Sequence, residues 1–301
     1  MKYWLTLVQV PESDQLVEIA RFAEEVGFYG ISVADHLVMP TQVASRYPYT
    51  EDGEMFWPID APWPDPWVTL GAMASVTSKL KLATNILLAA LRDPISTAKA
   101  SGTAAVLSGD RIVCGVGAGW IEEEYAIAGV DFKSRGRRLD EVIEVMRKLW
   151  TGQETSHKGE FFQFENALLR PAPSQPIPVW PGGHSAPALR RAARNDGWFG
   201  LPMTREQMAP FLETLRSTRE GLGKSWDDFH CSITLAEPQT DEATADLQKM
   251  GVTSLCAIAP WIPSPWETSK WYDPADDPGK LESKKRALER FSESVIRRFG
   301  D

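Results

Sequence analysis

Short apolar runs alternate with amphipathic stretches from one end of the chain to the other. A short apolar run predicts a buried strand, and an amphipathic stretch predicts a helix that packs one face against the strands. We expect eight strands, at residues 2–9, 30–35, 80–89, 111–119, 177–183, 197–200, 229–237 and 253–260. Eight strands alternating with helices in 301 residues predict a (β/α)8 TIM barrel with insertions in its βα loops, as one domain over residues 1–301. An open doubly wound sheet is the alternative.

The predicted helices carry recognisable start and stop signals. One begins at Ser13, ends at Gly27 and places four apolar residues on one face: Leu16, Ile19, Ala20 and Ala23. Asp93 as N-cap and Pro94 at the first helical position begin another, which runs to residue 108. Other helices are predicted at residues 66–77, 139–150, 241–250 and 278–299, from Ser185, and around residues 208–215. Residues 155–176 break the alternation and predict a hairpin.

The stretch from Leu37 to Pro66 shows neither periodicity. It contains six prolines, and Trp57, Trp63 and Trp67 lie at or just beyond its end. A connection of this length without secondary structure of its own is usually functional. We therefore expect it to be an insertion that faces the substrate.

The overall composition is typical of a soluble globular protein, with 43% hydrophobic and 24% charged residues. A net charge of −9 argues against nucleic acid or an anionic membrane as a partner. No apolar stretch approaches the roughly 20 residues of a membrane span, and the N-terminus is too polar after residue 10 for a secretory signal. Three cysteines in strand-like runs predict buried thiols and a cytoplasmic location: Cys114, Cys231 and Cys256.

In a barrel of this kind, functional groups follow the strands. Asp35 and His36 end the second predicted strand, and histidine is the side chain best suited to proton transfer near neutral pH. The alternative is a capping carboxylate beside a packed imidazole. No two of the four histidines have metal-ligand spacing, so we expect no metal.

A strand followed by Gly182, Gly183, His184 and Ser185 predicts a close backbone approach to a ligand. The free N–H groups at the start of the next helix favour a phosphate. A tight turn with Ser185 as the helix cap is the alternative. Another group of anion-binding candidates comprises Arg135, Arg137 and Arg138, for which we favour salt bridges to Asp140, Glu141 or neighbouring loops over contact with a ligand.

Gly115, Gly117 and Gly119 lie at the end of the fourth predicted strand, but they do not form a dinucleotide-binding fingerprint. That fingerprint requires a glycine or alanine where Trp120 stands, and no acidic residue ends a following strand about twenty positions further on. Asn85 lies in the apolar segment TNILL (84–88) of the third predicted strand, where a bulge can place a backbone group toward a ring system, although an ordinary buried strand is the default.

Four segments together resemble the bacterial luciferase-like superfamily of flavin- and deazaflavin-dependent oxidoreductases. They are RFAEEVGFYGISVADH at 21–36, LATNILLAALRDPISTAKASGTAAVLSGDRIVCGVGAGW at 82–120, RGRRLDEVIEVMRKLW at 135–150 and GEFFQFENALLRPAPSQPIPVWPGG at 159–183. The resemblance implies a (β/α)8 barrel, often dimeric, that binds FMN or coenzyme F420 at the carboxyl ends of its strands. The branch it resembles most favours F420, a deazaflavin that passes a hydride.

The resemblance also implies roles for individual residues. A non-prolyl cis peptide that presses against the cofactor ring would map to Asn85 and Ile86, and the phosphate site to Gly182, Gly183, His184 and Ser185. Asp35 and His36 would lie beside the ring and the substrate. The three glycines at 115, 117 and 119 would thin the barrel wall, so that the ring and Trp120 share the mouth. A glutamate serves as proton donor in related sugar-phosphate dehydrogenases about where Trp120 stands here, which argues against that reaction.

These observations predict hydride transfer between F420 and a small organic substrate. We expect His36 to donate or accept the proton, with Asp35 orienting it or touching the cofactor. The insertion at 37–66 and the loop after Pro260, with Trp261 and Trp266, would shape the substrate site. A reduced-FMN monooxygenase served by a separate flavin or deazaflavin reductase is the alternative, and a barrel that only binds is a third. We expect a homodimer.

Overall fold

Eight parallel strands form the centre of the molecule. The computed structural model describes residues 1–8, 10–263 and 271–300. The strands are β1 (Lys2–Leu7), β2 (Gly30–Val33), β3 (Lys81–Thr84), β4 (Ile112–Val116), β7 (Val179–Pro181), β8 (Gly197–Phe199), β9 (His230–Ile233) and β10 (Ser254–Ile258). They are hydrogen-bonded in the order β7-β4-β3-β2-β1-β10-β9-β8, and a parallel bridge between Gly182 and Phe199 joins the two ends. The predicted (β/α)8 barrel is confirmed, and the open sheet is wrong.

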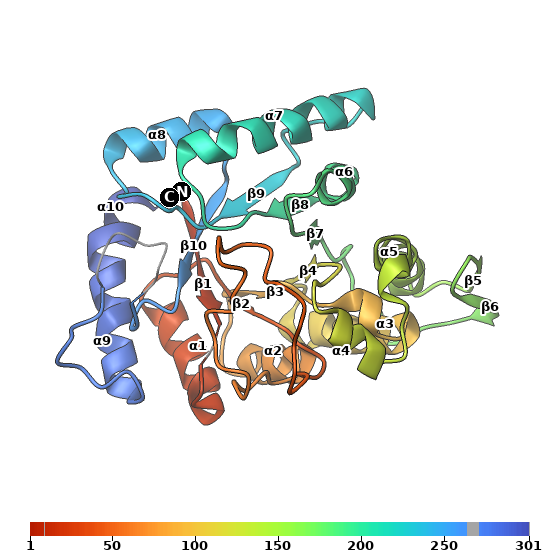
Figure 1. Ribbon diagram of the computed structural model, residues 1–301, viewed down its shortest axis with the longest axis horizontal. Helices are drawn as coiled ribbons and strands as arrows, with labels where there is room; N and C mark the ends of the chain where they lie inside the picture. The colour runs from red at the N-terminus through yellow and green to blue at the C-terminus, as the bar shows by residue number, and fades with distance from the viewer. Residues whose placement is uncertain (9, 264–270, 301) are drawn as a thin grey trace.

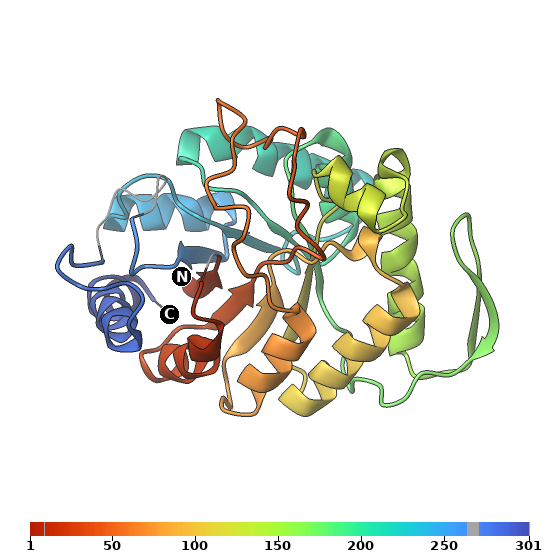
Figure 2. The ribbon, with the colours of Figure 1, turned by 60° about the horizontal axis from the view of Figure 1, so that its bottom comes forward.

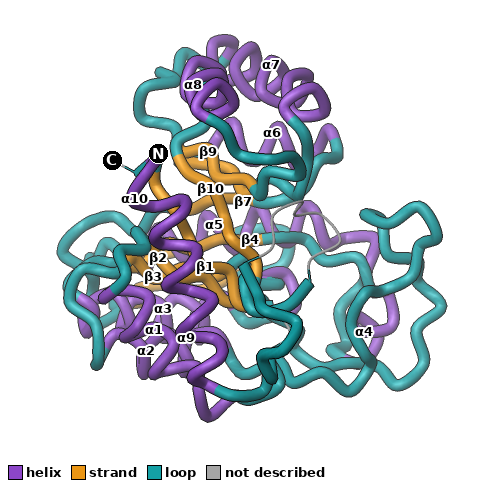
Figure 3. Tube along the Cα trace, turned by 90° about the vertical axis from the view of Figure 1, so that its left-hand side faces the viewer, coloured by secondary structure: helices purple, strands orange, loops and turns teal. Residues whose placement is uncertain are grey.

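Helices surround the strands on the outside of the barrel (Figures 1 and 3). They are α1 (Leu16–Glu25), α2 (Pro66–Ala74), α3 (Pro94–Ser108), α4 (Glu122–Ile127), α5 (Arg135–Trp150), α6 (Ala186–Arg194), α7 (Arg205–Gly221), α8 (Asp241–Met250), α9 (Leu281–Phe291) and α10 (Arg297–Phe299). The two ends of the chain lie together, and the amino group of Met1 donates to the carbonyl of Phe299 at 3.2 Å. None of the described helices is long and apolar enough to cross a bilayer.

Local sequence signals set most helix boundaries. Asp93 caps α3 by accepting the backbone N–H of Ser96 at 2.7 Å, with Pro94 in the first turn. The four apolar residues predicted to share a face of α1 are all buried. Several observed bounds differ from the predicted ones, and β3 and β4 are shorter than expected. Helix α5 begins at Arg135 instead of residue 139, and α4 was not predicted, because it is short and starts with three glutamates.

The barrel interior is filled by side chains of several strands. This interior cluster comprises Trp4, Ala83, Val113, Trp180, Phe199 and Cys256. The indole of Trp4 is fully buried, and a side chain on Gly30 of the neighbouring strand would collide with it. Ile86, just after β3, packs against the cluster at the carboxyl ends of the strands. The interior is therefore a solid core that supports the chain segments above it.

The predicted hairpin is present as β5 (Thr155–Lys158) and β6 (Gln163–Ala167), which project from the barrel (Figure 2). The ion pairs observed around α5 differ in part from those expected for its arginines. Arg137 pairs with Glu160 in the hairpin turn at 2.9 Å, as expected for a neighbouring loop. Asp140 instead binds Arg191 of α6, and Glu141 binds His157, so the expected salt bridges to those two carboxylates are wrong.

Candidate functional site

The carboxyl ends of the parallel strands lie at one end of the barrel, which we call the mouth. His36 follows β2, Asn85 and Ile86 follow β3, Trp120 follows β4, and Gly182–Ser185 follow β7. The insertion between β2 and α2 forms no helix or strand over residues 34–65 and extends beyond the barrel (Figure 2). The predicted site residues therefore lie at the same end of the molecule.

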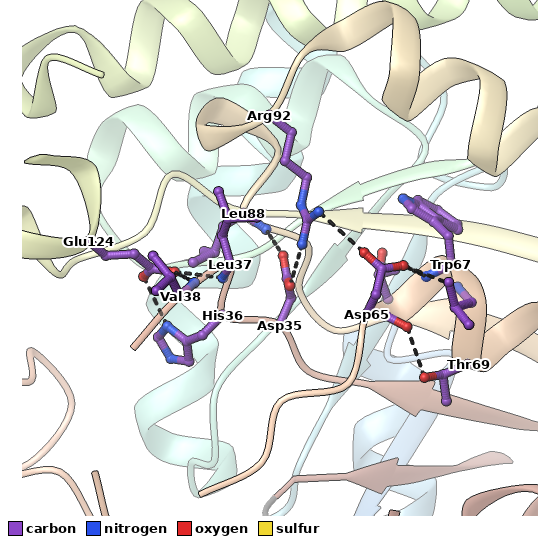
Figure 4. Close-up of polar contacts among 12 residues, drawn as sticks. Asp35, His36, Leu37, Val38, Asp65, Trp67, Thr69, Leu88, Arg92 and Glu124 are labelled. Carbon is purple, nitrogen blue, oxygen red and sulfur yellow. Dashed lines mark hydrogen bonds and ion pairs between the residues drawn. The ribbon is translucent and has the colours of Figure 1, made fainter. Parts of the chain in front are cut away.

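The imidazole of His36 is held by a glutamate on another element. Its Nδ1 lies 3.0 Å from Oε2 of Glu124 in α4 (Figure 4). The side chain of His36 is 8% exposed and that of Glu124 is 1% exposed. A carboxylate can only accept a hydrogen bond, so the proton of the pair is on Nδ1. The other ring nitrogen, Nε2, has no hydrogen-bond partner among the described residues.

Glu124 also holds the start of the insertion. Its second oxygen, Oε1, accepts the backbone N–H groups of Leu37 at 2.7 Å and Val38 at 3.3 Å (Figure 4). We did not predict this residue from the sequence. The available signal was a run of three glutamates beginning just after the glycine-rich end of β4, which only a closed barrel brings next to His36.

Asp35 makes no hydrogen bond to His36 in the described part of the chain, and its expected contact with the cofactor stays a prediction. Its carboxylate accepts the backbone N–H of Leu88 at 3.0 Å and pairs with Arg92 at 2.7 Å (Figure 4). Burial raises the pKa of Asp35, while the Arg92 guanidinium opposes that rise. Asp35 thus anchors the segment that follows β3, whereas the next residue, His36, contacts Glu124 of α4.

The Asn85–Ile86 peptide bond is cis, as the resemblance implied. The Ile86 side chain that follows it lies against two of the predicted cofactor-binding glycines. A side chain on Gly117 would collide with Ile86, and one on Gly182 would lie 3.1 Å from its Cγ2. These glycines therefore accommodate a side chain of the protein itself.

Gly115, within β4, and Gly119, after it, also leave room for atoms of the protein, and whether these glycines border a cofactor as well stays a prediction. A side chain on Gly115 would collide with the carbonyl of Thr84 and with the ring of Phe199. Gly119 has a φ of +71° and lies against Tyr125. Each glycine leaves room for core atoms or for a left-handed turn.

The insertion brings a group of aromatic rings to the mouth. This aromatic cluster comprises Tyr47, Tyr49, Phe56, Trp57, Trp63 and Trp120. Trp63 lies edge-on to His36, with ring centroids 4.7 Å apart, and the ring of Trp57 lies 6.0 Å away. Trp120 contacts Tyr47 at 5.2 Å. The cluster therefore joins the end of β2 to the end of β4 across the mouth.

Two indole groups of the aromatic cluster carry unused hydrogen-bond donors. Nε1 of Trp57 and Nε1 of Trp63 are buried and have no acceptor among the described residues. Both rings touch His36, and they touch each other at 5.8 Å. Buried donors are usually paired, so these two indoles keep a hydrogen-bonding capacity that the described residues do not use. Trp261 is buried in the core, and Trp266 lies outside the described residues.

The segment after β7 presents backbone N–H groups at the start of α6. Gly183 has a φ of +105°, and Ser185 caps α6 through its Oγ, 3.4 Å from the N–H of Ala188. The backbone N–H groups of residues 183–186 have no acceptor among the described residues. Unpaired N–H groups at a helix start attract phosphate groups. The helix cap and the anion site are thus compatible.

His184 contributes no positive charge to that segment. Its Nε2 accepts the backbone N–H of Leu201 at 3.0 Å, and its ring stacks on Phe211 with centroids 4.6 Å apart. Burial lowers the pKa of His184 to about 4, so the ring is neutral at pH 7. Within the described ranges, the structure holds no group of His, Cys, Asp and Glu side chains arranged for a metal ion.

The mouth therefore combines the imidazole of His36, indole N–H groups beside it and unpaired backbone N–H groups after β7. Comparison with known proteins shows the family of the chain. The family model of luciferase-like monooxygenases matches residues 4–293. A protein of Mycobacterium tuberculosis with no assigned activity is 33% identical over 280 residues, which cover 93% of this chain and 94% of that protein.

A relative with a named activity is the F420-dependent glucose-6-phosphate dehydrogenase of Amycolatopsis mediterranei. It is 31% identical over 230 residues, covering 73% of this chain and 63% of the relative. Among solved structures, the F420-dependent tetrahydromethanopterin reductase of Methanopyrus kandleri matches 99% of both chains, with a TM-score of 0.72 and 15% identity. A Baeyer–Villiger monooxygenase of Pseudomonas putida in complex with FMN matches 82% of this chain and 70% of its own, with a TM-score of 0.62 and 18% identity.

Proposed function

Because the chain belongs to the luciferase-like monooxygenase family, we propose that it transfers a hydride between coenzyme F420 and a small organic substrate. One observation carries this proposal: a buried histidine at the mouth holds its Nδ1 against Glu124 and leaves Nε2 without a partner among the described residues. A hydride transfer to or from a carbonyl carbon needs such a group to give or take the proton on oxygen. The F420-dependent relative supports the choice of cofactor.

The residues at the mouth fit a phosphate-bearing ring cofactor. The unpaired N–H groups of Gly183–Ala186 and the start of α6 would hold the phosphate, with Gly182 leaving room for Ile86. Asn85, Ile86, Gly117 and Trp120 would border the ring. When bound, F420 would supply the centre that accepts or donates the hydride.

The chain itself handles the proton and positions the substrate. In oxidation of an alcohol, Nε2 of His36 takes the hydroxyl proton; in reduction of a ketone, the same nitrogen returns it. Glu124 stabilises the imidazolium form at Nδ1. Asp35 contributes by holding Leu88 and Arg92, and thereby the chain segment after the cis bond.

The insertion favours a neutral, apolar substrate with one acceptor oxygen. Between Leu37 and Asp65, Arg46 is the one basic residue, and it binds the carbonyl of Asp52. The same stretch contains five carboxylates: Glu51, Asp52, Glu54, Asp60 and Asp65. A sugar phosphate would meet net negative charge there. A ketone or secondary alcohol would instead meet aromatic rings and two free indole donors.

A reduced-FMN monooxygenase with a separate reductase is the second candidate. It is favoured by the fold match to the FMN-bound monooxygenase. The phosphate of FMN would use the same N–H groups, so this segment does not discriminate between the cofactors. A cytoplasmic location stays a prediction.

Titration of the purified protein with F420 and, separately, with FMN tests the proposal through quenching of each cofactor's fluorescence. Tight binding of F420 with weak binding of FMN supports hydride transfer, and the reverse supports the monooxygenase. Gly183→Ala should weaken binding of the preferred cofactor, because a side chain there is strained and lies 3.2 Å from Ala188. Gly129→Ala is the matched control, since Gly129 is also left-handed but has open space around it. Binding of neither cofactor would contradict the phosphate site.

We also propose that the protein is a homodimer. The adjacent helices α2 and α3 carry four exposed apolar side chains: Val68, Ile95, Val106 and Leu107. Val68 and Leu107 are the most exposed of the four, and exposed apolar side chains on two helices in contact favour an interaction surface.

A further inference from the structure

Two glutamates in the first turn of α4 accept hydrogen bonds from the insertion at two separate points. Glu124 accepts the backbone N–H groups of Leu37 and Val38. The preceding residue, Glu123, accepts the backbone N–H groups of Ala44 at 2.7 Å and Ser45 at 3.1 Å. It also accepts the hydroxyl of Ser45 at 2.7 Å. Both glutamates therefore hold the insertion against α4, and of the two Glu124 alone also contacts His36.

We propose that Glu124 is a positioning residue that sets the tautomer of His36 and ties it to the position of the insertion. This proposal rests on the function proposed for His36, but its first test does not. The carboxylate accepts from Nδ1 with one oxygen and from the backbone with the other. A neutral His36 must then carry its proton on Nδ1, which leaves the lone pair on Nε2 for the substrate.

The electrostatic surroundings of the pair are limited to a few groups. Asp35 is close enough to interact with Glu124, and it is paired with Arg92, while Glu123 binds Ala44 and Ser45. On α4, Tyr125 follows Glu124, and burial raises the pKa of its hydroxyl, which keeps it uncharged. Trp57 and Trp63, on the insertion side, carry no charge. Glu124 is therefore the charge that acts directly on the imidazole.

Replacement of Glu124 by glutamine separates its contact with the insertion from its effect on the tautomer of His36. The amide of Glu124→Gln has one oxygen and one NH2 group in place of two acceptor oxygens. If the backbone N–H of Leu37 retains the oxygen, the NH2 group faces Nδ1 of His36. The ring must then accept at Nδ1, and its proton moves to Nε2. The variant thus keeps the hydrogen bond to the insertion and moves the proton of neutral His36 from Nδ1 to Nε2.

Nitrogen-15 NMR of the cofactor-free protein reads this tautomer directly, and the chain has only four histidines to assign. Wild type and Glu123→Gln should show His36 protonated at Nδ1 at pH 8, and Glu124→Gln should show it protonated at Nε2. A wild-type protein with the proton on Nε2 would overturn the proposal, whether or not any variant folds. Equal shifts in Glu123→Gln and Glu124→Gln would also overturn it.

Turnover with F420 provides the second readout. Glu124→Gln should lower kcat by about a hundredfold or more, the effect expected for a misplaced acid–base group. Glu123→Gln should change KM more than kcat, because it loosens the insertion alone. Glu124→Asp, which keeps the charge, should recover part of kcat and of the wild-type pH profile. A tautomer that inverts in a protein without F420 turnover would support the positioning role and contradict the proposed function.

Discussion

Asp35 and Arg92 form an ion pair with an N–O distance of 2.7 Å, which ties the end of β2 to the segment after β3. The same guanidinium reaches Asp65 at the far end of the insertion, at 3.3 Å (Figure 4). Asp35 is almost fully buried, whereas the side chain of Asp65 is 42% exposed. One arginine therefore joins three chain segments that converge beside His36.

Because Asp35 is more buried than Asp65, we expect its replacement to lower the free energy of unfolding by more than replacement of Asp65. Asp35→Asn should lower the free energy of unfolding by about 3 kcal/mol, because it leaves the Arg92 charge without its buried partner. Asp65→Asn should lower it by about 1 kcal/mol or less, since an exposed pair contributes little and asparagine can still cap α2. Urea unfolding at pH 7 measures both. Equal losses in the two variants would contradict this account.

His184 should make the protein less stable in acid. Its pKa is about 4 in the folded protein and near 6.5 in the unfolded chain, so the unfolded state binds the proton more readily between these values. The contribution of His184 to the free energy of unfolding should be fully present above pH 6.5 and fall as the pH is lowered toward 4. The loss due to this group is at most about 3 kcal/mol, and less where solvent reaches the ring. Urea unfolding of wild type at pH 7.5 and pH 5 gives the total change.

The variant His184→Gln isolates the contribution of this histidine. Glutamine keeps an acceptor for the N–H of Leu201 but does not titrate. The stability difference between pH 7.5 and pH 5 should therefore be smaller in the variant than in wild type. The same difference in both proteins would assign the acid sensitivity to other groups.

Removal of the Trp57 indole donor should weaken substrate binding. Trp57→Phe keeps a ring against His36 and removes the unpaired N–H, and should raise KM for a ketone or secondary alcohol by about three- to tenfold. Trp67→Phe is the matched control, because its buried N–H is also unpaired among the described residues but its ring is not part of the aromatic cluster. Steady-state kinetics should show no change in KM for the control. A similar change in both variants would mean that packing, not the donor, is responsible.

The exposed apolar side chains on α2 and α3 predict the site of self-association. Light scattering coupled to gel filtration should give twice the chain mass of 33.5 kDa for wild type. The double variant Val68→Asp/Leu107→Asp should shift the mass toward that of a single chain, because charge in an apolar interface is costly. Leu168→Asp, which charges an exposed leucine after β6, should remain dimeric. A monomeric wild-type protein would contradict the homodimer.

The order and type of the main elements could be predicted from the sequence because their signals are local. The caps at Asp93 and Ser185 and the apolar face of α1 depend on residues within one or two helical turns. The count of eight strands then favoured a closed barrel, and the resemblance to a family located the cis bond after β3. The six-residue helix α4 was missed because its sequence has no apolar periodicity.

The sequence by itself determined the barrel, the position of His36 at its mouth and the candidate phosphate segment. Only the tertiary structure decided which groups meet there. His36 lies 88 positions from Glu124, and Asp35 lies 57 positions from Arg92. Gly115 in β4 faces Phe199, and Gly117 just after β4 faces Ile86, both from other parts of the chain. Such contacts have no local signature, because they arise only when the closed sheet brings the ends of separate strands together.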